Sequence, residues 1–165
     1  MKKKWIIISR VISVILFMWS LYVLFDVTTR IYTNMHTGLR TGALRAENVG
    51  YGHLVKSFYI IYLTAFIALY AGIALMYEKK QGWIFAIIAC MLYTGSMLIS
   101  ARNNLIIENT NKLVGVSYFG AALLFATMFI LLVLKPFREK YRPAFKNWLF
   151  VGAIVGLIIV AKNIS

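Results

Sequence analysis

The sequence predicts an all-α, polytopic integral membrane protein, a bundle of five transmembrane helices, from three observations. Hydrophobic residues make up 61% of the 165 residues and charged residues only 14%, whereas soluble domains are about half apolar and about a quarter charged. The apolar residues gather in long runs, and about 20 of them in a helix cross a bilayer. The basic residues lie between these runs. The net charge of +13 therefore indicates topology signals and lipid contact, and we expect no nucleic-acid partner.

The predicted spans form a single membrane domain. They cover residues 5–25, 57–77, 83–101, 114–134 and 143–161. The first begins after three lysines, like a secretory signal, but its apolar run exceeds the usual length of about 7–15 residues and no small-residue cleavage site follows. We therefore expect an uncleaved anchor helix.

The fifth span is the weakest of the set, because Lys146 and Asn147 interrupt its start. Pro143 suits a first helical turn, where its missing N–H is not needed. The Lys146 side chain can extend from that turn to the head groups. The alternative is four spans plus a helix that lies in the membrane interface.

The distribution of Lys and Arg orients the bundle. With a cytoplasmic N-terminus, 11 of these residues lie inside and 7 outside, as the positive-inside rule requires. We expect a plasma (inner) membrane protein whose C-terminus is outside if all five helices span. Aromatic residues at the predicted cytoplasmic boundaries agree with this orientation. They are Trp5, Tyr77, Trp83 and Trp148.

The long outer connector, residues 26–56, is the first candidate site. Connectors beyond about 12–15 residues are uncommon and are usually functional or disordered. The arginine fork matches phosphate and carboxylate, so the basic residues here are candidate anion or ligand contacts; the alternative is a solvated loop. These candidates are Arg30, His36, Arg40, Arg45 and His53.

The same connector has further expected features. Its two histidines are far apart in sequence, without the i, i+4 spacing of a helical ligand pair, so we predict no metal site and no cofactor. Residues 41–48 are typical of a short helix, and Asp26 and Arg30 can pair at i, i+4 if the first helix continues outward. We expect the connector to be partly ordered against the outer ends of the bundle.

Two membrane motifs complete the candidates. Tyr59, Tyr62 and Tyr70 follow one helical stripe, which could line a site for a flat apolar ligand such as a quinone; packing and the aromatic belt are the alternative. Gly152 and Gly156 form a GxxxG motif, which lets two helix backbones approach closely. That motif predicts packing either within the chain or against a partner helix.

No predicted span has an ionisable residue near its middle. Such residues usually mark proton or ion pathways, so their absence argues against a pump, a charged channel or an intramembrane acid–base enzyme. The leading prediction is a non-catalytic accessory, assembly or anchoring subunit of a membrane complex, with lipids and other membrane subunits as partners. The alternatives are a carrier for a small or lipophilic molecule, and an enzyme acting on a lipid or quinone at the outer interface.

Overall fold

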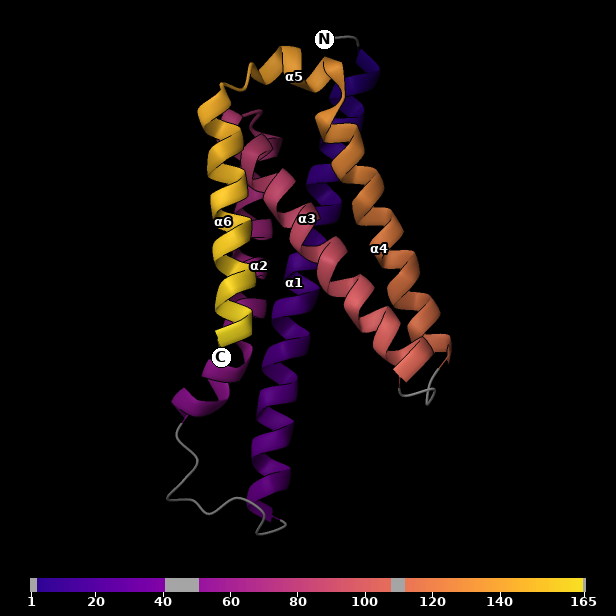
Figure 1. Ribbon diagram of the computed structural model, residues 1–165, viewed down its shortest axis with the longest axis vertical. Coiled ribbons are helices and arrows are strands. Elements are labelled where there is room, and N and C mark those ends of the chain that lie inside the picture. The colour runs from indigo at the N-terminus through magenta and orange to yellow at the C-terminus, as the bar shows by residue number, and fades with distance from the viewer. Residues whose placement is uncertain (1–2, 41–50, 108–111, 165) are drawn as a thin grey trace.

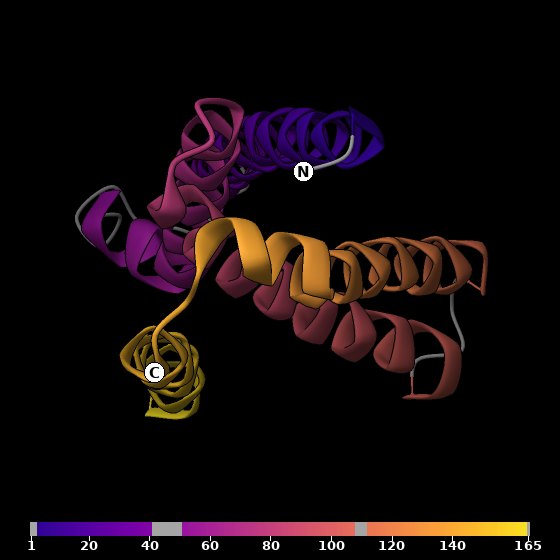
Figure 2. The same ribbon diagram turned by 90° about the horizontal axis from the view of Figure 1, so that it is seen from above.

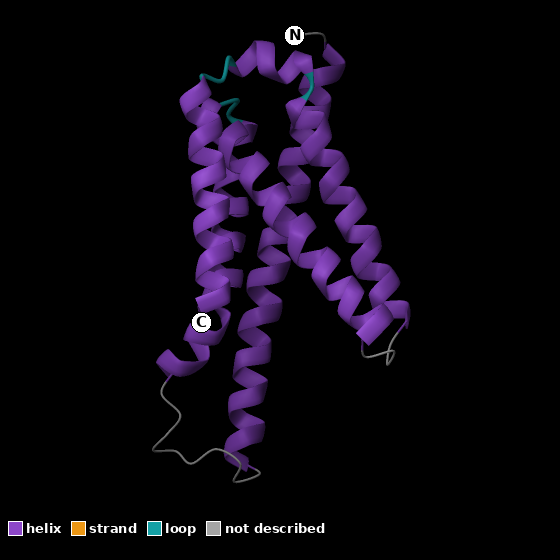
Figure 3. Ribbon diagram, in the orientation of Figure 1, coloured by secondary structure: helices purple, strands orange, loops and turns teal. Residues whose placement is uncertain are grey.

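In a computed structural model the chain is an all-α membrane helix bundle (Figure 1), described for residues 3–40, 51–107 and 112–164. No strand occurs in these ranges (Figure 3). The elements are α1 (Lys3–Arg40), α2 (Tyr51–Met76), α3 (Lys80–Arg102), the π-helical turn η2 (Asn103–Ile107), α4 (Lys112–Val133), α5 (Lys135–Tyr141) and α6 (Phe145–Ile164).

Four of these helices are long and apolar enough to cross a membrane. The spans are Lys4–Thr33, Phe58–Met76, Lys80–Leu105 and Lys112–Val133, with mean hydropathies of 2.0 to 2.3. The apolar part of α6, Phe145–Ile158, is shorter. Even so, α6 lies along the long axis of the bundle, whereas α5 lies across one end of it (Figure 1).

The helices alternate in direction. The start of α1, the turn between α2 and α3, and α5 lie together at one end of the molecule, here named the α5 end (Figure 1). The far ends of α1, α3 and α6 lie toward the opposite end. Helices α2 and α3 pack side by side, because the turn at residues 77–79 leaves no room for any arrangement but an antiparallel hairpin.

Helix α1 differs most from its predicted bounds, since it continues from residue 25 to Arg40. No proline interrupts this stretch, and Arg30 Nε donates to Asp26 Oδ2 at 2.8 Å one turn earlier, the pairing expected if the helix extended outward. Residues 26–40 and 51–56 of the predicted connector are therefore helical. The expected short helix at residues 41–48 lies outside the described residues.

The segment after α4 also differs from the prediction. The basic turn is itself a helix, α5, with Pro136 in its first turn, where a missing N–H costs nothing. The fifth long helix starts at Phe145, so Pro143 precedes it in the connection instead of occupying its first turn. The helix that lies across the bundle end is thus α5, and α6 follows the long axis.

Helix α3 forms the centre of the core. Its Trp83, Ile87, Ile88 and Cys90 side chains are fully buried. It packs against α2 and α4, and more lightly against α6. Viewed from above, α6 lies at the edge of the bundle, while α3 and α4 tilt away together (Figure 2).

Two glycines allow close helix approach in this core. Ser13 Oγ of α1 donates to the Gly72 carbonyl of α2 at 2.7 Å, and a Cβ on Gly72 would lie 3.0 Å from the α1 backbone. A Cβ on Gly82 would overlap the backbone of Ala74 and Leu75 in α2. The α1–α2 and α2–α3 contacts therefore both depend on the absence of a side chain.

Candidate functional site

The outer candidates Arg30 and His36 do not form one site. Arg30 is paired with Asp26, and the His36 ring lies against Tyr32, with ring centroids 4.3 Å apart. Six residues separate Arg30 from His36 on one helix, which rotates their side chains about 120° apart. The described parts of the chain contain no group of three or more His, Cys, Asp or Glu side chains that could hold a metal ion.

The remaining outer candidates cannot be placed against these two. Arg40 ends α1 and His53 is in the first turn of α2, but their side chains lie outside the described residues. Arg45 lies there entirely. An anion site formed by these three residues stays a prediction.

The tyrosine stripe of α2 divides between two neighbouring helices. Tyr62 follows the half-buried Tyr59 by about one helical turn. Its hydroxyl oxygen lies 3.0 Å from Thr28 Oγ1 of α1. Tyr70 instead donates from its hydroxyl to Gln81 Oε1 of α3 at 2.9 Å. Tyr62 and Tyr70 therefore contact different helices, and a ligand site formed by all three tyrosines stays a prediction.

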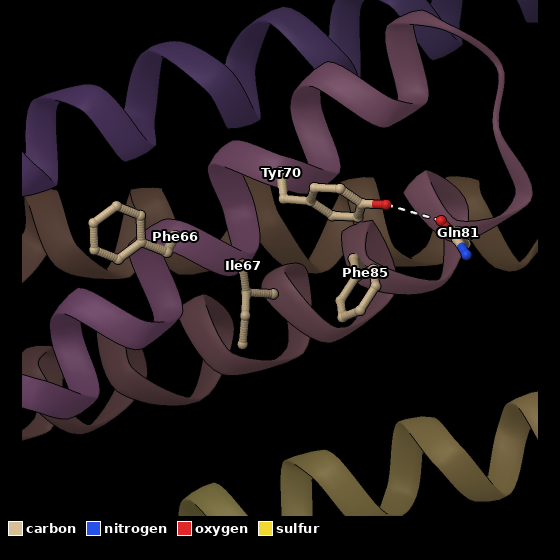
Figure 4. Close-up of a pocket in the computed structure, with 5 residues that line it drawn as sticks. All are labelled: Phe66, Ile67, Tyr70, Gln81 and Phe85. Atoms are coloured by element: carbon tan, nitrogen blue, oxygen red, sulfur yellow. Dashed lines mark hydrogen bonds between the residues drawn. The ribbon is translucent and has the colours of Figure 1, made fainter.

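Tyr70 belongs to an open groove of about 430 Å³ on the side of the bundle, here named the α2–α3 groove. It is lined by Phe66, Ile67, Tyr70, Gln81 and Phe85 (Figure 4). The Phe85 ring meets Tyr70 edge-on, with centroids 5.2 Å apart. The groove is open along the bundle surface, and its walls are aromatic and aliphatic except at the Tyr70–Gln81 end.

Helix α6 adjoins this groove. The Phe85 ring also lies edge-on to Phe150, with centroids 6.2 Å apart, so α6 borders the groove beside Phe85. Lys146 precedes Phe150 by four residues, as Gln81 precedes Phe85. The repeated spacing places one polar residue a turn before each aromatic residue, and this pattern was the signal in the sequence that could have identified the groove.

A second groove of about 460 Å³ follows the outer face of α1. Its lining is Ile15, Met18, Trp19 and Tyr22. The Trp19 ring contacts Phe125 of α4 and Tyr93 of α3, with centroids 5.4 and 6.4 Å away. Neither Trp19 Nε1 nor Tyr93 Oη has a hydrogen-bond partner among the described residues, although both atoms are buried. Buried polar atoms of this kind cost free energy.

The glycine motif of α6 faces away from the other helices that the structure describes. A Cβ built on Gly152 or Gly156 meets no atom within 4 Å. The opposite face packs on the core through Val151, Ile154 and Val155. The prediction that these glycines pack within the chain is therefore wrong, because α3 contacts the branched side chains of α6 instead.

The glycines are part of a continuous stripe, exposed except for the half-buried Gly156, here named the α6 outer face. Its members recur three and four residues apart, the spacing of one helix face. They are Leu149, Gly152, Ala153, Gly156, Leu157 and Val160. Four of these residues have apolar side chains. The two glycines have none, so they leave a shallow strip of bare backbone between the leucines.

The α5 end is held by polar contacts. Lys140 Nζ donates to Glu78 Oε2 at 2.6 Å, and Lys80 Nζ donates to the Arg142 carbonyl at 3.2 Å. The Lys140 hydrogen bond and charge lower the pKa of Glu78. Burial raises the pKa of Tyr141, which stacks on Trp83 with centroids 6.0 Å apart.

Trp83 differs from its predicted role as an interfacial aromatic, because it is only 1% exposed. Its Nε1–H donates to the Leu132 carbonyl at 2.9 Å. That carbonyl is in the last turn of α4, where backbone acceptors lack helical partners. The Trp148 ring of α6 packs edge-on against Trp83, with centroids 5.6 Å apart. Trp83 thus joins α3, α4, α5 and α6 at the α5 end.

No family model, curated protein or solved structure matches this chain. What it does is inferred from its own residues.

Proposed function

We propose that the protein is a small multi-pass membrane subunit that binds a transmembrane helix of another membrane protein through the α6 outer face. Its role in that complex is accessory, as an assembly or anchoring subunit. The observation that carries the proposal is the open space around Gly152 and Gly156.

The physical argument rests on how helices associate in lipid. Burying apolar surface gains little there, so van der Waals packing and hydrogen bonds hold helices together, and small residues permit the close approach that packing needs. Gly72 and Gly82 already serve this purpose inside the chain. The two glycines of α6 offer the same geometry, with no helix of the described residues against them.

We further propose that the α5 end faces the cytoplasm in a plasma (inner) membrane, with the C-terminus outside. Two features support this orientation. The start of α1, the α2–α3 turn and α5 share one end (Figure 1), and the basic residues counted as inner belong to these segments and to the start of α6. Labelling of Lys79→Cys only from inside and His36→Cys only from outside, in a Cys90→Ala background, is expected; the reverse pattern would overturn the orientation.

The alternatives receive less support. A carrier for a lipophilic molecule would use the two open grooves, which are shallow and lie on the outside of the bundle. An enzyme at the outer interface would need His36, His53 and the arginines over one pocket, whereas Arg30 is bound to Asp26 and His36 rests on Tyr32.

The test is affinity purification of the full chain in mild detergent, with identification of the proteins that come with it. A Gly152→Leu, Gly156→Leu double variant is expected to lose about tenfold of the bound partner, a change of about 1.4 kcal/mol in binding free energy. Its melting temperature should stay unchanged, because no described residue contacts these positions.

The matched control is the double variant Gly95→Leu, Gly120→Leu. These two glycines, on α3 and α4, also face open space. This control should keep the partner. An unchanged set of co-purifying proteins in the α6 variant would show that the α6 outer face contacts lipid.

A further inference from the structure

The α2–α3 groove has two chemically distinct levels. Deeper along the bundle its surface is apolar, with Phe66, Ile67 and Phe85 on α2 and α3 and Phe150 of α6 against Phe85. Figure 4 shows Phe66 and Ile67 at one end of this surface, with α6 crossing the view on the far side of Phe85. The groove opens sideways, so any occupant of the apolar level must come from the surrounding bilayer.

The second level lies one helical turn nearer the α5 end and is polar. Here the Tyr70 hydroxyl donates to Gln81 Oε1. The amide nitrogen of Gln81 is consequently directed away from Tyr70 (Figure 4) and can donate to a bound molecule. On α6, Lys146 stands at the corresponding level, four residues before Phe150, and is exposed.

Lys146 has no carboxylate partner within the described ranges. The three acidic residues there are each bound to another base: Asp26 to Arg30, Glu78 to Lys140 and Glu139 to Lys135. The neighbouring Lys80 directs its ammonium group to the Arg142 carbonyl. The mouth of the groove therefore holds the Gln81 amide donor, and the exposed Lys146 of the neighbouring helix carries a positive charge that no described carboxylate compensates.

We propose that the α2–α3 groove binds one phosphate-bearing anionic lipid of the adjacent leaflet. Its acyl chain lies on Phe66, Ile67, Phe85 and Phe150, and its phosphate lies between the Gln81 amide and Lys146. The amide donor and the uncompensated cation match the phosphate of such a lipid, and the apolar walls match its acyl chain. A neutral apolar ligand would leave Lys146 without a counterion.

The lining of this site differs from the proposed partner interface: Phe66, Ile67 and Phe85 are on α2 and α3, whereas the glycines of α6 face open space. Lys146 is exposed on the flank of α6, next to Leu149 and Ala153 of the α6 outer face. Phe66→Ala is therefore the variant that tests lipid binding without changing the partner interface.

The experiment uses the purified full chain in detergent, and it measures lipid binding by native mass spectrometry and by the shift of the melting temperature. Phosphatidylglycerol, phosphatidylcholine and inorganic phosphate are the three probes. We expect phosphatidylglycerol to bind about tenfold more tightly than phosphatidylcholine, and inorganic phosphate to give no shift, because it lacks the chain that fills the groove. Equal binding of the two lipids, or stabilisation by phosphate alone, would overturn the proposal.

Two variants locate the site. Lys146→Gln is expected to weaken phosphatidylglycerol binding about fivefold, the effect of one basic residue near an anionic head group. Arg138→Gln removes an exposed charge of α5 at the same end and should change the affinity less than about twofold. Equal losses in both variants would mean a diffuse attraction of the whole basic end, and no built site.

Phe66→Ala separates the chain contact from the head-group contact. Phe66 is 56% exposed, so its truncation should leave the fold intact. The substitution should weaken the binding of both lipids by a similar factor, because it removes contact with the acyl chain without changing the charge. Unchanged affinity for both lipids would show that the groove is empty of lipid.

Discussion

Helices α3 and α6 are both apolar and both contain glycine, yet Gly82 of α3 and the two motif glycines of α6 have opposite surroundings. Gly82 of α3 lies against the α2 backbone so closely that a Cβ would overlap it, whereas Gly152 and Gly156 of α6 meet nothing. Helix α3 is surrounded by α2, α4 and α6, and α6 has neighbours on one face only. The same residue type therefore marks the structural centre at position 82 and an available surface at positions 152 and 156.

The largest expected effect comes from filling the close contact in α3. Gly82→Ala places a methyl group less than 3.0 Å from the backbone of Ala74 and Leu75, and backbone cannot move aside as a flexible side chain can. Overpacking of this kind costs about 1–3 kcal/mol or more, so a marked fall in melting temperature or in the yield of folded protein is expected in detergent.

Gly120→Ala is the matched control for this substitution. Gly120 is also helical but faces open space, and alanine favours a helix over glycine by about 1 kcal/mol. Its melting temperature should stay level or rise. Equal melting temperatures for Gly82→Ala and Gly120→Ala would contradict the assignment of α3 as the packed centre.

A smaller effect is expected from Trp83→Phe. This change removes the donor to the Leu132 carbonyl and leaves a buried acceptor unpaired, at a cost of about 1–3 kcal/mol. Tyr93→Phe provides the comparison, because the Tyr93 hydroxyl is buried without a partner in the described structure. In thermal unfolding, the melting temperature of Trp83→Phe should lie below that of the wild type, and the melting temperature of Tyr93→Phe should equal or exceed it. If Tyr93→Phe destabilises as much as Trp83→Phe, the Tyr93 hydroxyl must be bonded.

The smallest effect concerns the ion pair between Glu78 and Lys140. Lys140 lowers the pKa of Glu78, so the pair contributes stability above the ordinary glutamate pKa of about 4.3 and loses it as pH falls through the lowered value. The pair is partly exposed, and such pairs contribute less than about 1 kcal/mol. Glu78→Gln should lower the melting temperature slightly at pH 7, and the difference from wild type should shrink as pH falls below the ordinary glutamate pKa of about 4.3. Identical melting temperatures at pH 7 would show that the pair contributes nothing.

The sequence was sufficient for the fold class, because a bilayer demands about 20 apolar residues per spanning helix and the runs are visible. It did not locate the end of α1, since the polar residues after Phe25 do not stop a helix when no proline intervenes. It also did not show that α5 is a helix lying across the bundle end, which is what buries Trp83 instead of leaving it at the interface.

The candidate site was less predictable for a related reason. A stripe on one helix is visible in the sequence, but its partners depend on how neighbouring helices are placed. Tyr70 was therefore a candidate, whereas Gln81, Phe85 and Lys146 became site residues only once α2, α3 and α6 were side by side. The GxxxG motif likewise predicted close approach without showing which surface would fill it.

The most direct test of the α6 interface is photocrosslinking in native membranes from position 149. Leu149 is 59% exposed on the α6 outer face, and a photoreactive leucine analogue there keeps its size. We predict a protein adduct of defined mass that disappears in the Gly152→Leu, Gly156→Leu background and does not form from the similarly exposed Leu123 of α4. Lipid adducts alone, equal at positions 149 and 123, would contradict the account.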